Sequence, residues 1–268
     1  MKKIYYLLGL PRSGNTLFGS LLNQNPRIKV TANSIVPDII WRTECLKGEQ
    51  IYNDFPDKNS LDNVLKNIIP NYYQNWDCDI IIDRSVWGLQ SNLELLEKYS
   101  PNEIRFIVLL RDIQEVIASY VHWSENNKPN FIDNVTDGTI KSKVDFILRE
   151  DGDLWRNYWS IIGARDSDYP CFFVEYKDLV NNTSKVLSSL YDFLEIEPFQ
   201  HKYNELDNFN INGLEYNDDM LGKNLHTVRK DGVKLSDYDI NKYISNGTQH
   251  ICSTLNFWKD GSLRKAWC

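Results

Sequence analysis

Cysteine is scarce in this 268-residue sequence, and no two of its five cysteines form a C-x-x-C pair. They are scattered over the chain, at Cys45, Cys78, Cys171, Cys252 and Cys268. An odd number of dispersed cysteines argues against a disulfide framework and against a structural zinc site, and it suits a reducing compartment. We therefore expect a cytoplasmic protein without a bound metal.

The sequence also lacks long apolar runs, low-complexity stretches, blocks of like charge and internal repeats. Its first apolar run begins at Ile4 and is too short for a signal peptide or a membrane-spanning helix, so we expect the mature protein to be the whole chain. The net charge of −7 and the isoelectric point near 5.2 disfavour binding to nucleic acid or to an anionic membrane. Because no linker is visible, residues 1–268 are expected to form a single domain.

What the chain does contain is a glycine-bounded turn, Gly9-Leu10-Pro11-Arg12-Ser13-Gly14-Asn15-Thr16, that follows the first apolar run. A strand that leads through such a turn into a helix points backbone N–H groups and the positive helix end at one spot, which favours an anion. The spacing fits G-x-x-x-x-G-x-[ST], but Asn15 stands where a nucleotide-clamping lysine is expected. Arg12 supplies a permanent cation within the loop. A purely structural strand-to-helix turn is the alternative interpretation.

Five apolar runs predict the strands of a parallel sheet. Continuous rather than alternating apolar residues are typical of strands that are covered on both faces. The predicted strands are residues 4–9, 28–31, 79–83, 105–110 and 171–176. Helical periodicity between them, clearest from Ile113 to Val121, predicts covering helices. The predicted fold class is therefore α/β, a three-layer sandwich with a central, mostly parallel sheet, similar to the P-loop NTPases.

Polar residues follow two of these strands, at the place where ligands of open α/β sheets bind. Asp83 and Arg84 end the third predicted strand; Asp83 is either a magnesium ligand of a kinase-like site or the ion-pair partner of Arg84. Arg111 ends the fourth strand, and Ser119 lies in the helix that follows. For Arg111, an ion pair with an acidic neighbour such as Glu115 is the ordinary explanation, but its combination with Ser119 favours an anion site.

Taken together, the loop at residues 9–16, Arg111 with Ser119, the stretch Val174-Glu175-Tyr176-Lys177-Asp178-Leu179 and the late pair Arg229-Lys230 form a specific combination. Over about residues 4–232 the chain resembles the sulfotransferases that use 3′-phosphoadenosine 5′-phosphosulfate (PAPS). It is most similar to the branch whose loop reads Pro-Arg-Ser-Gly. No single motif carries the resemblance, which depends on their order and separation.

The resemblance implies a donor site. Its residues would be Arg12, Ser13, Gly14, Asn15, Thr16, Arg111, Ser119, Tyr176, Arg229 and Lys230. The loop would hold the 5′-phosphosulfate, Arg111 and Ser119 the 3′-phosphate, and Tyr176 would lie near the adenosine. The two late cations would close over the nucleotide. Arginine suits a bidentate grip on phosphate oxygens, and a serine hydroxyl adds a donor without further charge.

The reaction that the resemblance implies is in-line transfer of the sulfuryl group to a hydroxyl or amine, without a metal. The acceptor would be a small molecule, a carbohydrate or a peptide, and 3′-phosphoadenosine 5′-phosphate (PAP) would leave. Arg12 would stabilise the leaving phosphate, and Arg84 would contact the moving group. The tyrosylprotein branch has a catalytic glutamate where this chain has none, in residues 30–34. We therefore expect His226, in a polar segment predicted to loop over the site, to be the base, with Asp38 as second candidate.

Two other functions fit parts of the sequence. A P-loop kinase is favoured by Asp83 and opposed by the missing lysine. A non-catalytic protein that binds a nucleotide or a sulfated ligand is suggested by the uncertain base. Magnesium-dependent nucleotide binding would support the first function, and donor binding without turnover would support the second.

Overall fold

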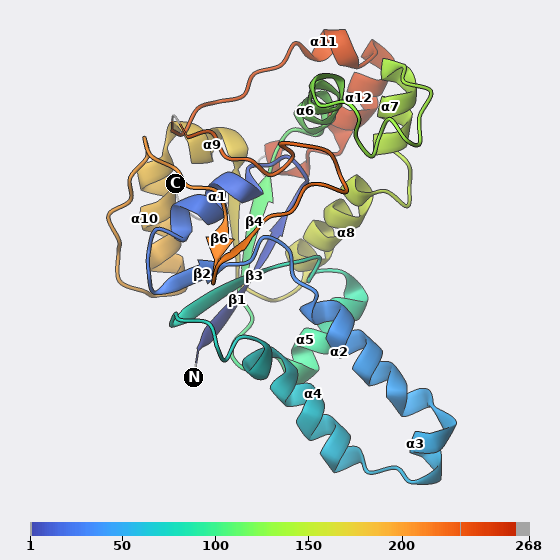
Figure 1. Ribbon diagram of the computed structural model, residues 1–268, viewed down its shortest axis with the longest axis vertical. Helices are drawn as coiled ribbons and strands as arrows, with labels where there is room; N and C mark the ends of the chain where they lie inside the picture. Colours follow the sequence, from blue (N-terminus) through green and yellow to red (C-terminus); the bar gives the residue numbers. More distant parts are fainter. Residues whose placement is uncertain (1, 231, 261–268) are drawn as a thin grey trace.

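The computed structural model describes residues 2–230 and 232–260 and has a five-stranded, fully parallel sheet at its centre (Figure 1). In sheet order, the strands are β2 (Ile28–Val30), β3 (Ile80–Arg84), β1 (Lys3–Gly9), β4 (Phe106–Leu110) and β5 (Cys171–Glu175). All five strands predicted from the sequence are present within one or two residues of their expected bounds. The prediction of a parallel α/β sheet is confirmed.

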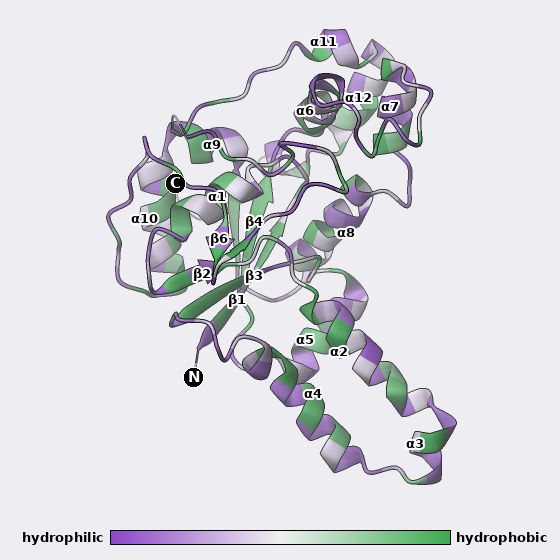
Figure 2. Cartoon of the chain, viewed as in Figure 1, coloured by the Kyte–Doolittle hydropathy of each residue, from purple (hydrophilic) through white to green (hydrophobic). Residues whose placement is uncertain are grey.

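The strands form because their continuous apolar runs can be buried on both faces. In β1, Tyr5 and Leu7 pack against one layer of helices, whereas Ile4, Tyr6 and Leu8 pack against the other. This alternation follows from the two-residue period of a strand. The strands are accordingly among the most hydrophobic parts of the ribbon (Figure 2).

Helices cover both faces of the sheet, which gives the predicted three layers. One face carries α1 (Asn15–Leu22), α9 (Tyr176–Asn181) and α10 (Thr183–Leu194). The core on the other face is completed by α2 (Val36–Cys45), α4 (Lys58–Tyr72), α5 (Gln90–Tyr99), α6 (Ile113–Asn126), α7 (Ile140–Ile147), α8 (Asp153–Asp166), α11 (Ile240–Tyr243) and α12 (Asn246–Thr254).

An arm made of α2, the short helix α3 (Gln50–Asp54) and α4 projects from the sheet (Figure 1). At its tip Ile51 and Phe55 are more than four-fifths exposed. Within the described residues, short 3₁₀ turns lie at Leu46–Gly48 and Phe257–Lys259. Among the residues that the structure describes, no helix is long and apolar enough to cross a membrane.

The strand order places the site. β2 and β3 lie on one side of β1, and β4 and β5 lie on the other, so the order in which strands are added to the sheet reverses next to β1. In open parallel sheets a crevice forms at such a point, outside the carboxyl ends of the strands. The loops after β1, β3, β4 and β5 therefore meet at one edge. The segment between α10 and α11 has only a short hairpin, β6 (Asn210–Ile211) with β7 (Leu214–Glu215), and part of it lines the same edge.

Candidate functional site

The loop after β1 has the backbone geometry of an anion site. Gly14 adopts φ 88° and caps the N-terminus of α1, and Arg12 adopts φ 60°, a conformation that is costly for a residue with a side chain. A Cβ at Gly14 would lie 2.9 Å from the ring of Tyr176, so only glycine fits between the loop and α9. The first N–H groups of α1 have no partner within the helix. They are available to an anion bound in the loop.

Two loop side chains hold this turn together. The Ser13 hydroxyl, which is fully buried, donates to the Leu10 carbonyl at 2.6 Å, and the Asn15 amide donates to the same carbonyl at 2.8 Å. The Asn15 side chain occupies the space that a Cβ at Gly9 would need, with Oδ1 2.1 Å from that position. Asn15 therefore turns back onto the loop, whereas the lysine that is usual at this position extends towards the phosphates.

The Arg12 side chain connects the loop to two distant parts of the chain. Its Nε donates to the Ser119 hydroxyl of α6 at 3.2 Å, and its Nη1 donates to the Leu225 carbonyl at 2.6 Å. Burial lowers the pKa of the guanidinium from its ordinary value, but an arginine remains charged in a protein. The guanidinium is thus held between the phosphate loop and the polar segment between α10 and α11, which we call the late polar segment.

Arg111 lies directly behind the loop and is only 4% exposed. Its guanidinium donates to the carbonyls of Arg12 at 2.9 Å and Ser236 at 3.2 Å, and it lies 4.2 Å over the ring of Tyr176. It also pairs with Glu115 at 3.3 Å. The ordinary ion pair with Glu115 is therefore present, and the same guanidinium also contacts the loop and Tyr176.

Arg84 and Asp83 point to opposite sides of β3. Arg84 lines the cleft, and it donates to the carbonyl of Ala32 at 3.0 Å and to the Asn33 side chain. Its Nε is buried and has no hydrogen-bond partner among the described residues. Asp83 is fully buried on the other side, where it accepts hydrogen bonds from Tyr73 and two further side chains. The pKa of Asp83 is raised to about 6, because the effect of burial exceeds the opposing effect of these hydrogen bonds.

Neither interpretation offered for Asp83 therefore holds within the described part of the chain. Its side chain is not among those that line the cleft, where a magnesium ligand would have to be, and its carboxylate makes no ion pair with Arg84. The physical reason is the alternation of side chains along a strand, which sends neighbouring residues to opposite faces. Among residues 2–230 and 232–260 there is also no group of three His, Cys, Asp or Glu side chains that could hold a metal ion.

The late polar segment brings His226 to the same cleft. Its Nδ1 lies 2.5 Å from Oδ1 of Asp218, and its ring stacks on Tyr216 with the centroids 3.8 Å apart. Burial lowers the pKa of His226 from its ordinary value, and the hydrogen bond to Asp218 raises it. The tyrosine hydroxyl accepts from the amide of Asn33, so the segment is connected to the turn that precedes α2. Asp38, the other base candidate, is exposed in the first turn of α2 and also lines the cleft.

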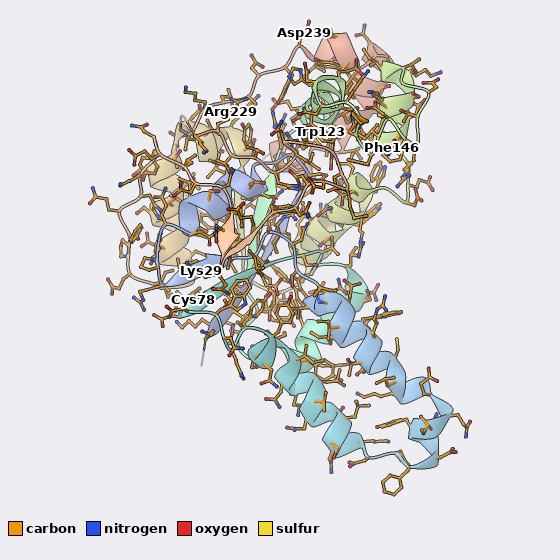
Figure 3. The ribbon with its side chains drawn as sticks, viewed as in Figure 1. Lys29, Cys78, Trp123, Phe146, Arg229 and Asp239 are labelled. Atoms are coloured by element: carbon orange, nitrogen blue, oxygen red, sulfur yellow. The ribbon has the colours of Figure 1, made fainter. Side chains whose placement is uncertain are left out.

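These residues surround one cleft of about 570 Å³. Eleven of the residues proposed from the sequence line it: Arg12, Gly14, Asn15, Thr16, Asp38, Arg84, Arg111, Ser119, Tyr176, His226 and Arg229. Ser13 and Lys230 do not line it. The side chain of Ser13 is buried inside the loop, and Lys230 is exposed outside the cleft. Arg229 lies on the side of the molecule that carries α1 and α9, far from Lys29 and Cys78 near the opposite end of the sheet (Figure 3).

A family model described as the sulfotransferase family matches residues 6–201. The chain belongs to this family. The resemblance inferred from the motifs is thereby confirmed, and the matched region runs from β1 to beyond α10. It ends before His226, which lies in the segment that the family model does not cover.

One solved structure that covers nearly the whole chain shows the same fold. The mouse sulfotransferase SULT7A1 complexed with PAP is 12% identical, with a TM-score of 0.53, over 99% of this chain and 86% of that one. A sulfotransferase domain from the curacin biosynthetic pathway is 16% identical, with a TM-score of 0.46, over 75% of this chain and 76% of the other. A comparison with curated protein sequences finds no match.

Several residues that form or support the cleft carry no sequence signal. Tyr216, which lines the cleft, and Asp218, which contacts His226, lie in an irregular, Asn- and Asp-rich stretch where no periodicity or motif marks them. Asp153, Arg156 and Asn157 come from the first turns of α8 and line the cleft. Their helical spacing could have shown that they share a face, but it could not have shown that this face meets the cleft.

Proposed function

We propose that this protein transfers the sulfuryl group of PAPS to a hydroxyl or amine of an acceptor. The observation that carries the proposal is the convergence of Arg12, Arg111, Ser119 and Tyr176 on a glycine-bounded loop, in one cleft of a sulfotransferase-family chain. A related structure of the same fold was determined with PAP, the product that this donor would leave. The acceptor would be a small molecule, a carbohydrate or a peptide, and the protein would act in the cytoplasm.

The donor would lie along the edge of the sheet. Its 5′-phosphosulfate would accept hydrogen bonds from the N–H groups at the start of α1, and its 3′-phosphate would lie near Arg111 and Ser119. The aromatic ring of Tyr176 would contact the adenosine. Arg229 would approach the nucleotide from the late segment, whereas Lys230, outside the cleft, would contribute only long-range attraction.

The chemistry would be a single in-line displacement at sulfur. The acceptor oxygen forms a bond to sulfur while the bond from sulfur to the phosphate oxygen breaks, and PAP leaves with the electron pair of that bond. The acceptor proton passes to Nε2 of His226. Arg12 and Arg84 stabilise the charge that develops on the transferred group and the leaving phosphate, and neither can act as the base.

A binding and transfer experiment tests this proposal. Calorimetry should show binding of PAP without added magnesium, and an acceptor screen with ³⁵S-labelled PAPS should yield a labelled product. Magnesium-dependent binding of ATP with no affinity for PAP would support a kinase instead. PAP binding without transfer to any class of acceptor would leave a nucleotide-binding protein and would overturn the enzymatic proposal.

A further inference from the structure

Asp218 binds His226 at two points. Its Oδ1 lies 2.5 Å from Nδ1 of the imidazole, and its Oδ2 accepts from the backbone N–H of the same histidine at 2.8 Å. The two residues are eight positions apart, and both are largely buried, with side chains 14% and 22% exposed. Both carboxylate oxygens therefore act on one residue. This arrangement fixes the imidazole in position and in rotation.

Tyr216 holds the same imidazole from its face. The two rings are stacked, with their centroids 3.8 Å apart and their planes inclined by 17°. The tyrosine hydroxyl accepts from the amide of Asn33, which itself accepts from Arg84. The imidazole is thus clamped between a carboxylate at its edge and an aromatic ring that is tied to the cleft wall.

The partners determine which nitrogen carries the proton. An ionised carboxylate can only accept, so in the neutral imidazole Nδ1 carries the proton and Nε2 keeps its lone pair. No hydrogen bond to Nε2 is found among residues 2–230 and 232–260, and His226 lines the cleft. The charged groups that act on the ring are Asp218 and the guanidinium groups of Arg84 and Arg12. Together with burial, the two cations favour the neutral imidazole, which is the form that can take a proton.

We propose that Asp218 is a positioning residue that holds His226 as the Nδ1–H tautomer, with Nε2 directed to the acceptor. The significance of this pair for catalysis rests on the proposed sulfuryl transfer, whereas the tautomer itself does not. A carboxylate that orients a histidine base in this way also stabilises the imidazolium that forms when the proton is taken. A carboxylate that only stabilises the loop would not have these effects on the histidine.

Nuclear magnetic resonance tests the tautomer without any acceptor. The chain has four histidines, so a ¹⁵N-labelled sample gives few imidazole signals, and His226→Gln identifies the one in question. We expect the Nδ1–H form in the wild-type protein near pH 7. Asp218→Asn should lower the pKa of His226 and populate the Nε2–H form, because the amide can donate as well as accept. Asp219→Asn, which removes the same charge at an exposed neighbour, should change neither. An Nε2–H form in the wild-type protein would overturn the proposal.

Kinetics test the catalytic part, once the acceptor screen has given a substrate. Asp218→Asn should lower kcat by about 10²-fold, at the lower end of what general bases contribute, with the KM for PAPS unchanged. The acidic limb of its pH profile should move to lower pH, and Asp218→Glu should recover part of the rate. An unchanged kcat and pH profile would overturn the role of Asp218 but leave sulfuryl transfer intact. Conversely, absence of transfer in the wild-type protein would refute the proposed function, while the tautomer measurement would still stand.

Discussion

Replacing Arg111 by alanine removes the cation that we assign to the 3′-phosphate of the donor. The guanidinium is 4% exposed and lies over the Tyr176 ring at 4.2 Å, so a phosphate bound to it would be shielded from water. A charge-assisted hydrogen bond in such a place contributes about 1.5–3 kcal/mol. Each 1.4 kcal/mol is a factor of ten in affinity, so PAP should lose about 10- to 100-fold more affinity than 5′-AMP, which has no 3′-phosphate.

Calorimetry with both nucleotides measures this difference. Arg111 also supports the Arg12 carbonyl and the Tyr176 ring, so both ligands can bind more weakly to Arg111→Ala, and only the difference between them reports on the 3′-phosphate. Arg156→Ala is the matched control, because it removes an arginine that lines the same cleft from α8. It can weaken the binding of both ligands through lost long-range attraction, but it should not reproduce the 10- to 100-fold difference between PAP and 5′-AMP. Equal losses for PAP and 5′-AMP in Arg111→Ala would refute the assignment.

Three further predictions concern the base, the loop and the buried carboxylate. His226→Ala should lower kcat by about 10²- to 10⁴-fold without changing the affinity for PAP. Because burial lowers the pKa of this histidine, the rate of the wild-type protein should reach its plateau at or below pH 7. Nearly full activity in His226→Ala would show that the base is elsewhere, and Asp38 would be tested next. Gly14→Ala should destabilise the fold by about 1–3 kcal/mol in urea unfolding and should weaken PAP binding. The reason is that a residue with a side chain is strained at φ 88° and that its Cβ would approach the ring of Tyr176. An unchanged urea midpoint would contradict this prediction. Asp83 has a folded-state pKa of about 6, above its ordinary 3.8, so its contribution to the free energy of unfolding is complete below pH 4 and is lost as the pH rises through 6. The loss amounts to about 3 kcal/mol in the wild-type protein and should be absent from Asp83→Asn. The same dependence of the free energy of unfolding on pH in both proteins would contradict the burial argument.

The sequence determined the sheet and the phosphate loop because both depend on local patterns. Continuous apolar runs such as Phe106–Leu110 can only be satisfied by burial on both faces, and their bounds matched the observed strands closely. Gly9 leaves room for the side chain of Asn15, six residues later, and Gly14 adopts a positive φ of 88° at the start of α1. The meeting of Arg12 and Arg111 at one edge followed from the rule for parallel sheets.

Tertiary structure alone decided which of two neighbouring polar residues faces the cleft. Asp83 and Arg84 are adjacent in the sequence, and their alternation was certain, but its phase relative to the cleft depended on the helices packed on each face. The same holds for Lys230, whose neighbour Arg229 lines the cleft while Lys230 does not. No pattern within the segment fixes these directions.

The pairing of Asp218 with His226 was also beyond the sequence. His226 could be singled out because histidines are few and this one lies near cations, but its partner lies in a stretch without regular structure. Helices and strands repeat, so residue spacing predicts which side chains share a face. An irregular loop has no such period, and its side chains meet only where the folded chain holds them. Here the His226 ring stacks on Tyr216, and the Tyr216 hydroxyl accepts from Asn33, which lies nearly two hundred residues earlier in the turn before α2.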